Sequence, residues 1–378
     1  MCLQRKRKNH FYELNTMKHN WEYKKLGEVC EILDSKRKPV TKKDRKVGQY
    51  PYYGAMGIQD YVDSFIFDGD YLLVGEDGAK WGANDKSAFQ VHGKCWVNNH
   101  AHILKVNEDE ICSSFIEHYL VGKDLSSYIT GAVVPKLTQA SLVSIPIPIP
   151  PLPIQQKIVA ELDKVCLIID KQKAQLKELD TLAQSIFYDM FGDPVENEKG
   201  WKTYKLEDVS TLINGRAYKQ EELLKEGKYK VLRVGNFFTN DNYYYSNLEL
   251  DDDKYCYPGD LLFAWSASFG AFIWKGEKTI FHYHIWRVLY DVELLNIHYF
   301  QYLLNALTTY FMKDVHGIGM VHLTKAGMEQ YILPIPPLSL QQSFTDKINV
   351  IEQQKAAITQ SIAETQKLFD YTMDKYFG

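Results

Sequence analysis

The chain has 378 residues, which is enough for two domains of ordinary size with buried cores. It carries 48 acidic against 44 basic side chains, a net charge of −4, so any nucleic-acid binding must come from local patches and not from the chain as a whole. No apolar run reaches membrane-spanning length, and the six cysteines form no C-x-x-C pair. This composition argues against a zinc site or a disulfide framework and predicts a cytoplasmic protein.

The first segment, residues 1–16, contains the basic run Arg5–Lys8 and no periodic apolar pattern. We expect a disordered extension here, and a DNA-contacting basic arm is the alternative. Internal homology begins just after Met17, which favours the extension.

The first domain, residues 17–151, is mainly short strands joined by turns. The Gly- and Ala-containing stretch 75–82 predicts an exposed loop. Apolar and aromatic runs predict strands at Asp60–Phe67, which ends at the turn Asp68-Gly69, and at Tyr71–Val74 and His102–Val106, with a helix at Ile111–Leu120.

A long helix is predicted for residues 152–192. The proline-rich stretch Pro148–Pro153 leads into it, since Pro is tolerated in a first turn, where an N–H has no partner to lose. No Gly or Pro follows until Gly192, which ends the helix. Apolar side chains recur at alternating steps of four and three from Ile158 onward, interrupted at Gln172. This is the heptad seam of a coiled coil.

The second domain, residues 193–337, shows the same type of pattern. Strands are predicted at Lys230–Val234, Leu261–Phe263 and His284–Leu289, an exposed loop at Trp265–Gly270, and a helix at Ile297–Tyr310.

The second long helix, residues 338–378, repeats the first at an offset of 186 residues without a gap. Each helix is about 57 Å long. We predict that the two pair with each other as an antiparallel coiled coil, because duplication gives them equal length and register; packing in an ordinary helical core is the alternative. The second seam contains polar residues, which we expect to mark a partner surface: Lys355, Thr365 and Thr372.

The duplication extends through both domains. Trp21 and Leu26 correspond to Trp201 and Leu206, and the Leu-Thr pair at Leu137 recurs 186 residues later. The fold class is therefore α/β (α+β), with two irregular-sheet domains repeated by pseudo-two-fold symmetry and separated by the two paired helices. The domain interiors have diverged, so we expect a shared fold with different surfaces.

Catalytic motifs are missing from the sequence. It has no G-x-x-x-x-G-K-[ST] phosphate loop, no H-E-x-x-H, no G-x-S-x-G and no Asn/Asp-Pro-Pro-aromatic tetrapeptide. His100 with His102, and His282 with His284, alternate on strand-like runs and could ligate a metal. The sequence places no carboxylate or cysteine beside them, so we interpret them as structural histidines and expect no metal site.

Basic clustering is the positive signal. Residues 34–46 contain seven Lys or Arg against two Asp, with tyrosines just downstream. A solvated charged loop is the alternative to a DNA contact. Cations bind phosphates, whereas Tyr, Asn and Ser reach base edges. The candidate DNA contacts are Lys36, Arg37, Lys38, Lys42, Lys43, Tyr52, Tyr53, Lys80, Lys136, Arg216, Lys219, Arg233, Asn236, Tyr243, Ser266 and Ser268.

The two Pro-x-Pro-Pro-Leu-x-x-Gln-Gln helices, the Trp-x-x-x-x-Leu openings and the Gly-x-x-x-x-x-Leu-Thr runs resemble the specificity subunit of type I restriction–modification systems. The likeness covers residues 17–378. The resemblance implies two target recognition domains that each recognise one half of a split site in double-stranded DNA, with the paired helices as the spacer between them.

The same resemblance implies a division of labour. Two modification (methyltransferase) subunits and the restriction subunits would be the partners, and adenine-N6 methylation and cleavage would take place there. S-adenosylmethionine, ATP and Mg²⁺ would bind the partners, and this chain would hold no cofactor and catalyse nothing by itself. The alternatives are a non-catalytic coiled-coil scaffold, a stand-alone DNA methyltransferase and a metal enzyme.

Overall fold

The computed structural model describes residues 21–238, 242–312 and 323–377, so the basic run Arg5–Lys8 lies outside it. The chain divides into two compact units. Unit 1 comprises the residues up to Lys173 and those from Gln360 onward, and unit 2 comprises Ala174–Thr359. Each long helix is therefore shared between the units. No helix among the described residues is long and apolar enough to cross a membrane.

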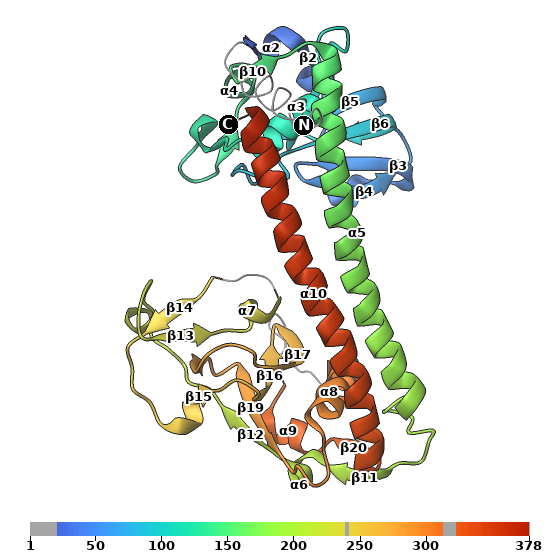
Figure 1. The fold of residues 1–378 in the computed structure, drawn as a ribbon, viewed down its shortest axis with the longest axis vertical. Helices are drawn as coiled ribbons and strands as arrows, with labels where there is room; N and C mark the ends of the chain where they lie inside the picture. Colours follow the sequence, from blue (N-terminus) through green and yellow to red (C-terminus); the bar gives the residue numbers. More distant parts are fainter. Residues whose placement is uncertain (1–20, 239–241, 313–322, 378) are drawn as a thin grey trace, which may run out of the picture. The chain divides into compact units, whose positions relative to one another are not determined.

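The two long helices are α5 (Leu152–Phe191) and α10 (Leu338–Phe377), as predicted. Within each unit, the two run side by side (Figure 1). Leu162 in the first half of α5 shares a core with Met373 near the end of α10, in unit 1. Phe187 near the end of α5 contacts Phe344 near the start of α10, in unit 2. The pairing is therefore antiparallel, which confirms the prediction.

Polar residues in the helix seam make hydrogen bonds and ion pairs inside the protein, although the side-chain oxygen of Gln172 is buried without a partner. The Gln172 amide donates to the Ser361 hydroxyl at 2.7 Å in unit 1. Lys355 lies 2.7 Å from Asp180 and 2.9 Å from Glu352 in unit 2. Such polar pairs fix the register of a coiled coil. The hydroxyls of Thr365 and Thr372 donate to carbonyl oxygens of their own helix, and the partner surface expected at these seam positions stays a prediction.

Unit 1 contains a six-stranded sheet with the order β2-β7-β5-β6-β3-β4. Helix α3 (Ser113–Gly122) packs against it, close to its predicted place. The strands are β2 (Cys30–Ile32), β3 (Val47–Gly54), β4 (Gly57–Val62), β5 (Phe67–Gly75), β6 (Ala88–Val97) and β7 (Ala101–Val106).

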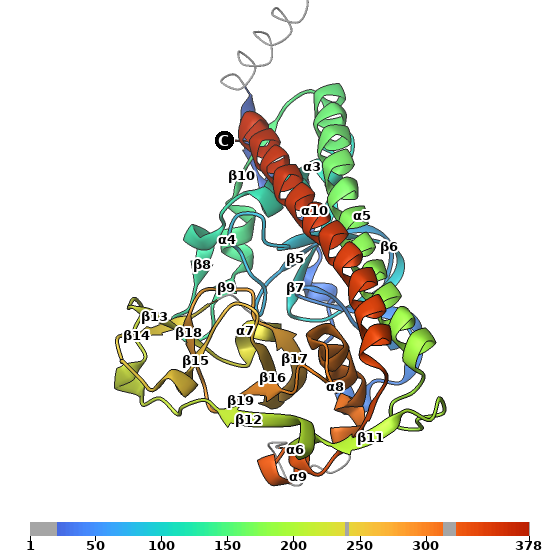
Figure 2. The same ribbon diagram turned by 60° about the horizontal axis from the view of Figure 1, so that its bottom comes forward.

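Unit 2 contains two four-stranded sheets, β12-β19-β16-β17 and β14-β13-β18-β15. Helix α8 (Ile297–Phe311) lies against β17 (Figure 2). Its Asn305 accepts a hydrogen bond from the Ala271 N–H at 2.7 Å. The strands are β12 (Ser210–Asn214), β13 (Tyr229–Leu232), β14 (Tyr244–Ser246), β15 (Tyr255–Cys256), β16 (Leu261–Ser266), β17 (Ser268–Ile273), β18 (Thr279–Phe281) and β19 (Ile285–Tyr290).

The two units share one topology. The order β2-β7-β5-β6 in unit 1 corresponds to β12-β19-β16-β17 in unit 2. In both, a further strand joins in parallel: β3 beside the end of β6, and β13 beside β18. Strands β17 and β18 of unit 2 together correspond to the single long strand β6 of unit 1. Because this strand is broken, unit 2 has two sheets where unit 1 has one. The shared fold expected from the duplication is therefore confirmed.

The proline-rich stretches before α5 and α10 form short strands. β10 (Pro146–Ile149) pairs with β1 (Glu22–Lys25), and β20 (Ile332–Ile335) pairs with β11 (Lys202–Lys205). These are two-stranded sheets, where Pro is tolerated because an edge strand leaves alternate N–H groups unpaired. The Leu-Thr pairs that recur in both copies also have a structural role. The side chains of Thr138 and Thr324 each cap the N-terminus of a short helix by accepting a hydrogen bond from a backbone N–H.

Two local predictions were wrong. The strand expected at Asp60–Phe67 is divided: β4 ends at Val62, β5 begins at Phe67, and the supposed turn Asp68-Gly69 lies within β5. The loop expected at Trp265–Gly270 is the hairpin of β16 and β17, which turns at Ala267 with φ of 64°. Small residues there permit a tight turn and not a long loop.

Candidate nucleic-acid interface

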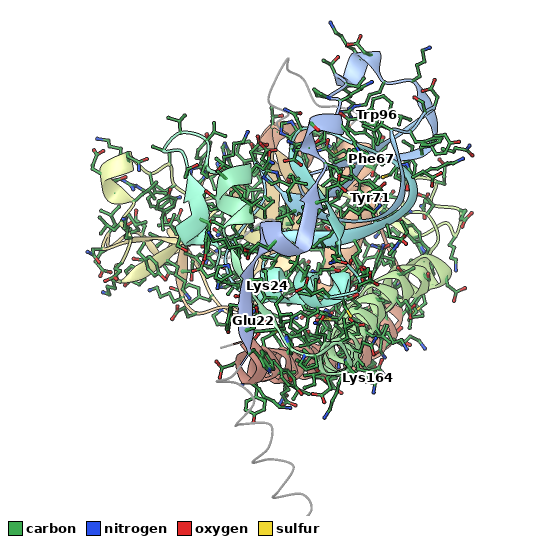
Figure 3. All side chains as sticks on the ribbon, turned by 90° about the horizontal axis from the view of Figure 1, so that it is seen from above. Glu22, Lys24, Phe67, Tyr71, Trp96 and Lys164 are labelled. Carbon is green, nitrogen blue, oxygen red and sulfur yellow. The ribbon has the colours of Figure 1, made fainter. Side chains whose placement is uncertain are left out.

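The basic segment, residues 34–46, folds against the six-stranded sheet of unit 1. It contains two short 3-10 turns, Asp34–Lys36 and Lys42–Asp44. Trp96 on β6, labelled in Figure 3, donates its indole N–H to the carbonyl oxygen of Lys38 at 2.6 Å. The backbone is thus held against the sheet, while four predicted phosphate contacts remain exposed: Lys36, Lys38, Lys42 and Lys43.

Arg37 has a different environment from the lysines around it. Its guanidinium lies 2.5 Å from Glu76 and 3.2 Å from Asp34, and it donates to the Ala101 carbonyl oxygen at 2.7 Å. Its side chain is 12% exposed. A guanidinium engaged by two carboxylates inside the protein is not free for a phosphate, so the structure assigns Arg37 an anchoring role instead of the predicted DNA contact.

His102 completes this buried charge cluster. Its Nδ1 lies 2.5 Å from Asp34 and its Nε2 lies 2.7 Å from the Leu137 carbonyl oxygen. Both ring nitrogens are therefore hydrogen-bonded within the protein, in agreement with the structural interpretation. Ligand atoms of Asp34, Glu76 and His102 lie within 4.8 Å of one another, as in a metal site, but the Arg37 guanidinium already contacts both carboxylates.

The predicted tyrosines of unit 1 lie in the sheet. Tyr52 is 1% exposed, its hydroxyl contacts the backbone of Val40, and the Arg45 guanidinium lies 4.1 Å from its ring centre. The structure therefore places Tyr52 in the core and not on a base-contacting surface. Tyr53 is half-buried against Phe89, and this burial raises the pKa of its hydroxyl.

The two remaining lysines of unit 1 differ. Lys80 is exposed in the loop that follows β5. Lys136 lies 2.6 Å from Glu76, and 41% of its side chain is exposed. Lys136 and Arg37 therefore share one carboxylate, which brings the segment around residue 136 next to the basic segment.

In unit 2, Arg216 binds Glu222 through two hydrogen bonds of 2.9 and 2.7 Å. These bonds lower the pKa of the Glu222 carboxyl to about 2. Lys219 is exposed beside this pair. The charge of Arg216 is paired with Glu222, but 32% of its side chain is exposed, so Arg216 and Lys219 both stay candidates for a phosphate contact.

The next group of predicted contacts surrounds α7 (Gly235–Phe238). The Arg233 guanidinium lies 4.6 Å from the centre of the Tyr244 ring. Asn236 accepts from the Arg233 N–H at 2.9 Å and donates to the Asn242 carbonyl oxygen at 3.0 Å, so its amide supports the backbone. Tyr243 is half-buried, with the Lys230 ammonium 5.4 Å from its ring centre.

The two predicted serines flank the β16–β17 turn. Ser266 is 2% exposed, and Ser268 is half-buried. A hydroxyl as buried as that of Ser266 does not reach a base edge, so the structure places it in the core and not at the predicted interface. Ser268 keeps partial exposure and stays a candidate.

The buried charge cluster of unit 1 is replaced in unit 2. By strand register, the positions of Asp34 and His102 correspond to Asn214 and Trp286. Trp286 donates its indole N–H to Asn214 at 2.5 Å and stacks on Trp265, which stands where unit 1 has Glu76. A cavity of about 690 Å³ lies at this aromatic cluster. The two units therefore share a backbone but differ in chemistry at this position.

Sequence reasoning missed the partners of the basic segment. Asp34 opens the segment and lies three residues before Arg37, a spacing that could have suggested a local ion pair. Glu76 and His102 are distant in sequence, so no local pattern could have indicated them. Arg45, one of the seven basic residues of the segment, lies 3.3 Å from Asp60, and its guanidinium lies over the Tyr52 ring.

Comparison with known proteins gives a consistent result. The family model for the type I restriction modification DNA specificity domain matches residues 18–181 and 198–366. A protein of Haemophilus influenzae assigned as a type I restriction enzyme specificity subunit is 29% identical over 365 residues, which cover 93% of each chain. The type I restriction enzyme MjaVIII specificity subunit of Methanocaldococcus jannaschii is 22% identical over 394 residues, covering 92% of this chain and 90% of that protein.

Solved structures show the same fold. The crystal structure of a type I restriction–modification S subunit from M. genitalium matches with a TM-score of 0.54 and 14% identity, covering 95% of this chain and 96% of that chain. A chain from a structure of complex assembly in the type I restriction–modification system matches with a TM-score of 0.52 and 18% identity, covering 95% and 98%. The family model covers well over half of the residues in two successive copies, and the chain therefore belongs to the type I restriction–modification DNA specificity family.

Proposed function

We propose that this chain recognises a split site in double-stranded DNA, one half-site per unit. The observation that carries the proposal is that equivalent positions of one shared strand arrangement hold different side chains in the two units. The order of four strands, β2-β7-β5-β6 and β12-β19-β16-β17, is the same in both units, whereas Asp34, Glu76 and His102 of unit 1 give way to Asn214, Trp265 and Trp286 in unit 2. A shared scaffold with different side chains suits the recognition of two different sequences.

The contact set that we propose follows from exposure. Lysines bind phosphates without sequence preference, and half-buried polar side chains near them are placed to reach base edges. The proposed contacts are Lys36, Lys38, Lys42, Lys43, Tyr53, Lys80, Lys136, Arg216, Lys219, Arg233, Tyr243 and Ser268.

We propose further that the chain binds two modification subunits, because the duplicated helices offer two similar surfaces, and that restriction subunits join this complex. Catalysis, and the binding of S-adenosylmethionine, ATP and Mg²⁺, would belong to those partners, with the assembly in the cytoplasm. Co-purification with the modification subunit followed by mass measurement tests the stoichiometry. A stable assembly that excludes any such subunit would contradict it.

The experiment for split recognition is sequencing of modified adenines in cells that carry this chain with its modification subunit. We expect a motif of two short sequences separated by unspecified bases. A hybrid chain, with residues 198–337 replaced by those of another specificity subunit, should change one half of the motif and leave the other half intact. A continuous motif, or a hybrid in which both halves change, would contradict the proposal.

A further inference from the structure

Two valines are exposed at the tip of the hairpin formed by β8 (Ile129–Thr130) and β9 (Lys136–Leu137) in unit 1. Val133 is 93% exposed and Val134 is 63% exposed. The tip is a defined turn: Gly131 has φ of 93°, and a Cβ there would lie 2.3 Å from the Val134 carbonyl oxygen. The fold therefore presents two adjacent apolar side chains to solvent on a tight, glycine-dependent turn.

The base of this hairpin is fixed to the core of unit 1. The Leu137 N–H donates to the Glu76 carbonyl oxygen at 2.8 Å, and the Leu137 carbonyl oxygen contacts His102 Nε2 at 2.7 Å. Lys136 adds an ion pair of 2.6 Å with the Glu76 carboxylate. Leu137 itself is fully buried. The tip thus projects from an anchored base, which reduces the entropic cost of ordering it when it binds.

The surroundings of the hairpin are cationic. One oxygen of Glu76 binds Lys136 and the other binds Arg37, so the hairpin base lies beside the basic segment. Lys36 and Lys38 flank Arg37 and are exposed. An apolar tip beside exposed cations fits a partner that has negative charge along the rim of a groove and apolar groups inside the groove. A DNA groove has this arrangement, with phosphates along its rim and thymine methyl groups and base faces inside.

We propose that the β8–β9 hairpin enters a groove of the DNA half-site bound by unit 1, with Val133 and Val134 in apolar contact with its bases. This inference rests on the proposed function and names a contact additional to it. Valine suits the task because its χ1 angle is already restricted, so insertion removes little rotamer freedom. The contact adds affinity for sites with a compatible base step, whereas the nearby lysines supply affinity for any DNA.

The second copy of the repeat matches the two valines only in part. Gly131 aligns with Gly317 and Leu137 with Leu323, so Met320 stands at the position of Val134 and Gly319 at the position of Val133. Residues 313–322 lie outside the described part of the chain, so this comparison is one of sequence. Apolar character is therefore kept at one of the two positions, and the two copies differ in sequence at both.

The test uses the complete complex of this chain with its modification subunit. Replacing both residues, Val133→Ser with Val134→Ser, should weaken binding to the cognate site at least about tenfold, the size of one good base contact. Binding to unrelated DNA and the salt dependence should not change, because no phosphate contact is removed. Val292→Ser is the matched control: Val292 is 65% exposed in unit 2 and should tolerate the change without effect.

Hydrogen exchange of the unmodified complex gives a measurement that does not depend on the variant. Residues 129–137 should become protected when cognate DNA is added. Unchanged affinity of the double variant together with unchanged exchange would overturn the inference. Dissociation of modification subunits from the double variant, with no DNA-dependent protection, would assign the tip to a protein contact instead. If the unmodified complex recognises no split site, the proposed function itself fails.

Discussion

Gln155 in α5 and Gln341 in α10 make the same three hydrogen bonds, each within its own unit. Both side chains are fully buried. The Gln155 amide donates to the carbonyl oxygens of Pro150 at 2.7 Å and Glu110 at 3.1 Å, and its oxygen accepts from the Cys112 N–H at 2.8 Å. The partners of Gln341 are the carbonyl oxygens of Pro336 (2.8 Å) and Leu294 (2.8 Å) and the N–H of Asn296 (2.7 Å).

Replacing Gln155 with Leu should therefore destabilise unit 1. The change leaves one N–H and two carbonyl oxygens buried without a partner, and we expect a decrease of about 3 kcal/mol in the free energy of unfolding, since each such group costs about 1–3 kcal/mol. Urea unfolding measures it. Gln156→Leu is the control, because Gln156 is exposed. Equal stability of the two variants would show that the buried amide contributes nothing.

Removing charge from the basic segment should have different effects at its exposed lysines and at its buried arginine. Replacing Lys36, Lys38, Lys42 and Lys43 with Ala should leave stability unchanged. It should also lower the slope of log affinity against log salt by about one for each phosphate that is no longer neutralised. DNA affinity at several salt concentrations gives the slope. An unchanged slope would identify the segment as a solvated loop.

Arg37→Ala should have the opposite profile. Asp34 and Glu76 would lose their shared guanidinium and keep His102 and Lys136 as side-chain partners, and breaking a buried ion pair costs about 3–5 kcal/mol. We expect a lower thermal midpoint, with DNA binding reduced in proportion to the decrease in folded protein. Normal stability combined with a reduced salt slope would restore Arg37 as a phosphate contact.

A pH dependence of stability is expected in unit 2. Burial, reinforced by His284 and Arg233, lowers the pKa of His282 from 6.5 to about 4. Between these values the unfolded chain binds more protons than the folded one, so stability should fall as the pH is lowered from 6.5 towards 4. Thermal unfolding at successive pH values measures this. His282→Gln should flatten the dependence, and an unchanged dependence in this variant would contradict the assignment to His282.

Helix length should control the gap between the two half-sites. Gln172 pairs with Ser361 and Asp180 with Lys355, which places Leu176 opposite Ile358 in the seam. Inserting one heptad after each of these two residues preserves the seam and adds about 10.5 Å per helix, or at most about three base pairs. Sequencing of modified adenines should show the same half-sites with a longer gap. Modification at sites with the original spacing would contradict the prediction that helix length sets the gap between the half-sites.

The long helices and the duplicated layout could be predicted from the sequence because both depend on local periodicity and repetition. The antiparallel pairing followed from equal length and register, and the seam residues Ile158 and Phe344 lie in the expected cores. The hairpin at Ala267 could not be predicted in the same way, since a non-glycine residue with positive φ gives no signal in composition.

The candidate interface was harder to predict because exposure depends on contacts distant in sequence. Lys36 and Arg37 are neighbours with the same charge, yet one is exposed and the other is buried against Glu76, which lies 39 residues away. Tyr52 and Tyr53 differ for a similar reason, because adjacent residues of a strand face opposite sides of the sheet. A charge pattern alone therefore identified the segment but not the roles of its members.

The division of each long helix between the two units has a consequence for synthesis. Phe377, the last described residue, lies 5.3 Å from the ring centres of both Phe115 and Tyr119 in unit 1, whereas unit 2 ends at Thr359. Domains begin to fold while the ribosome is still adding residues. The first residues of unit 1 are translated first, but the segment that completes its fold is translated last. A frameshift or premature stop within the final turns of α10 would therefore damage the half of the molecule that was translated earliest.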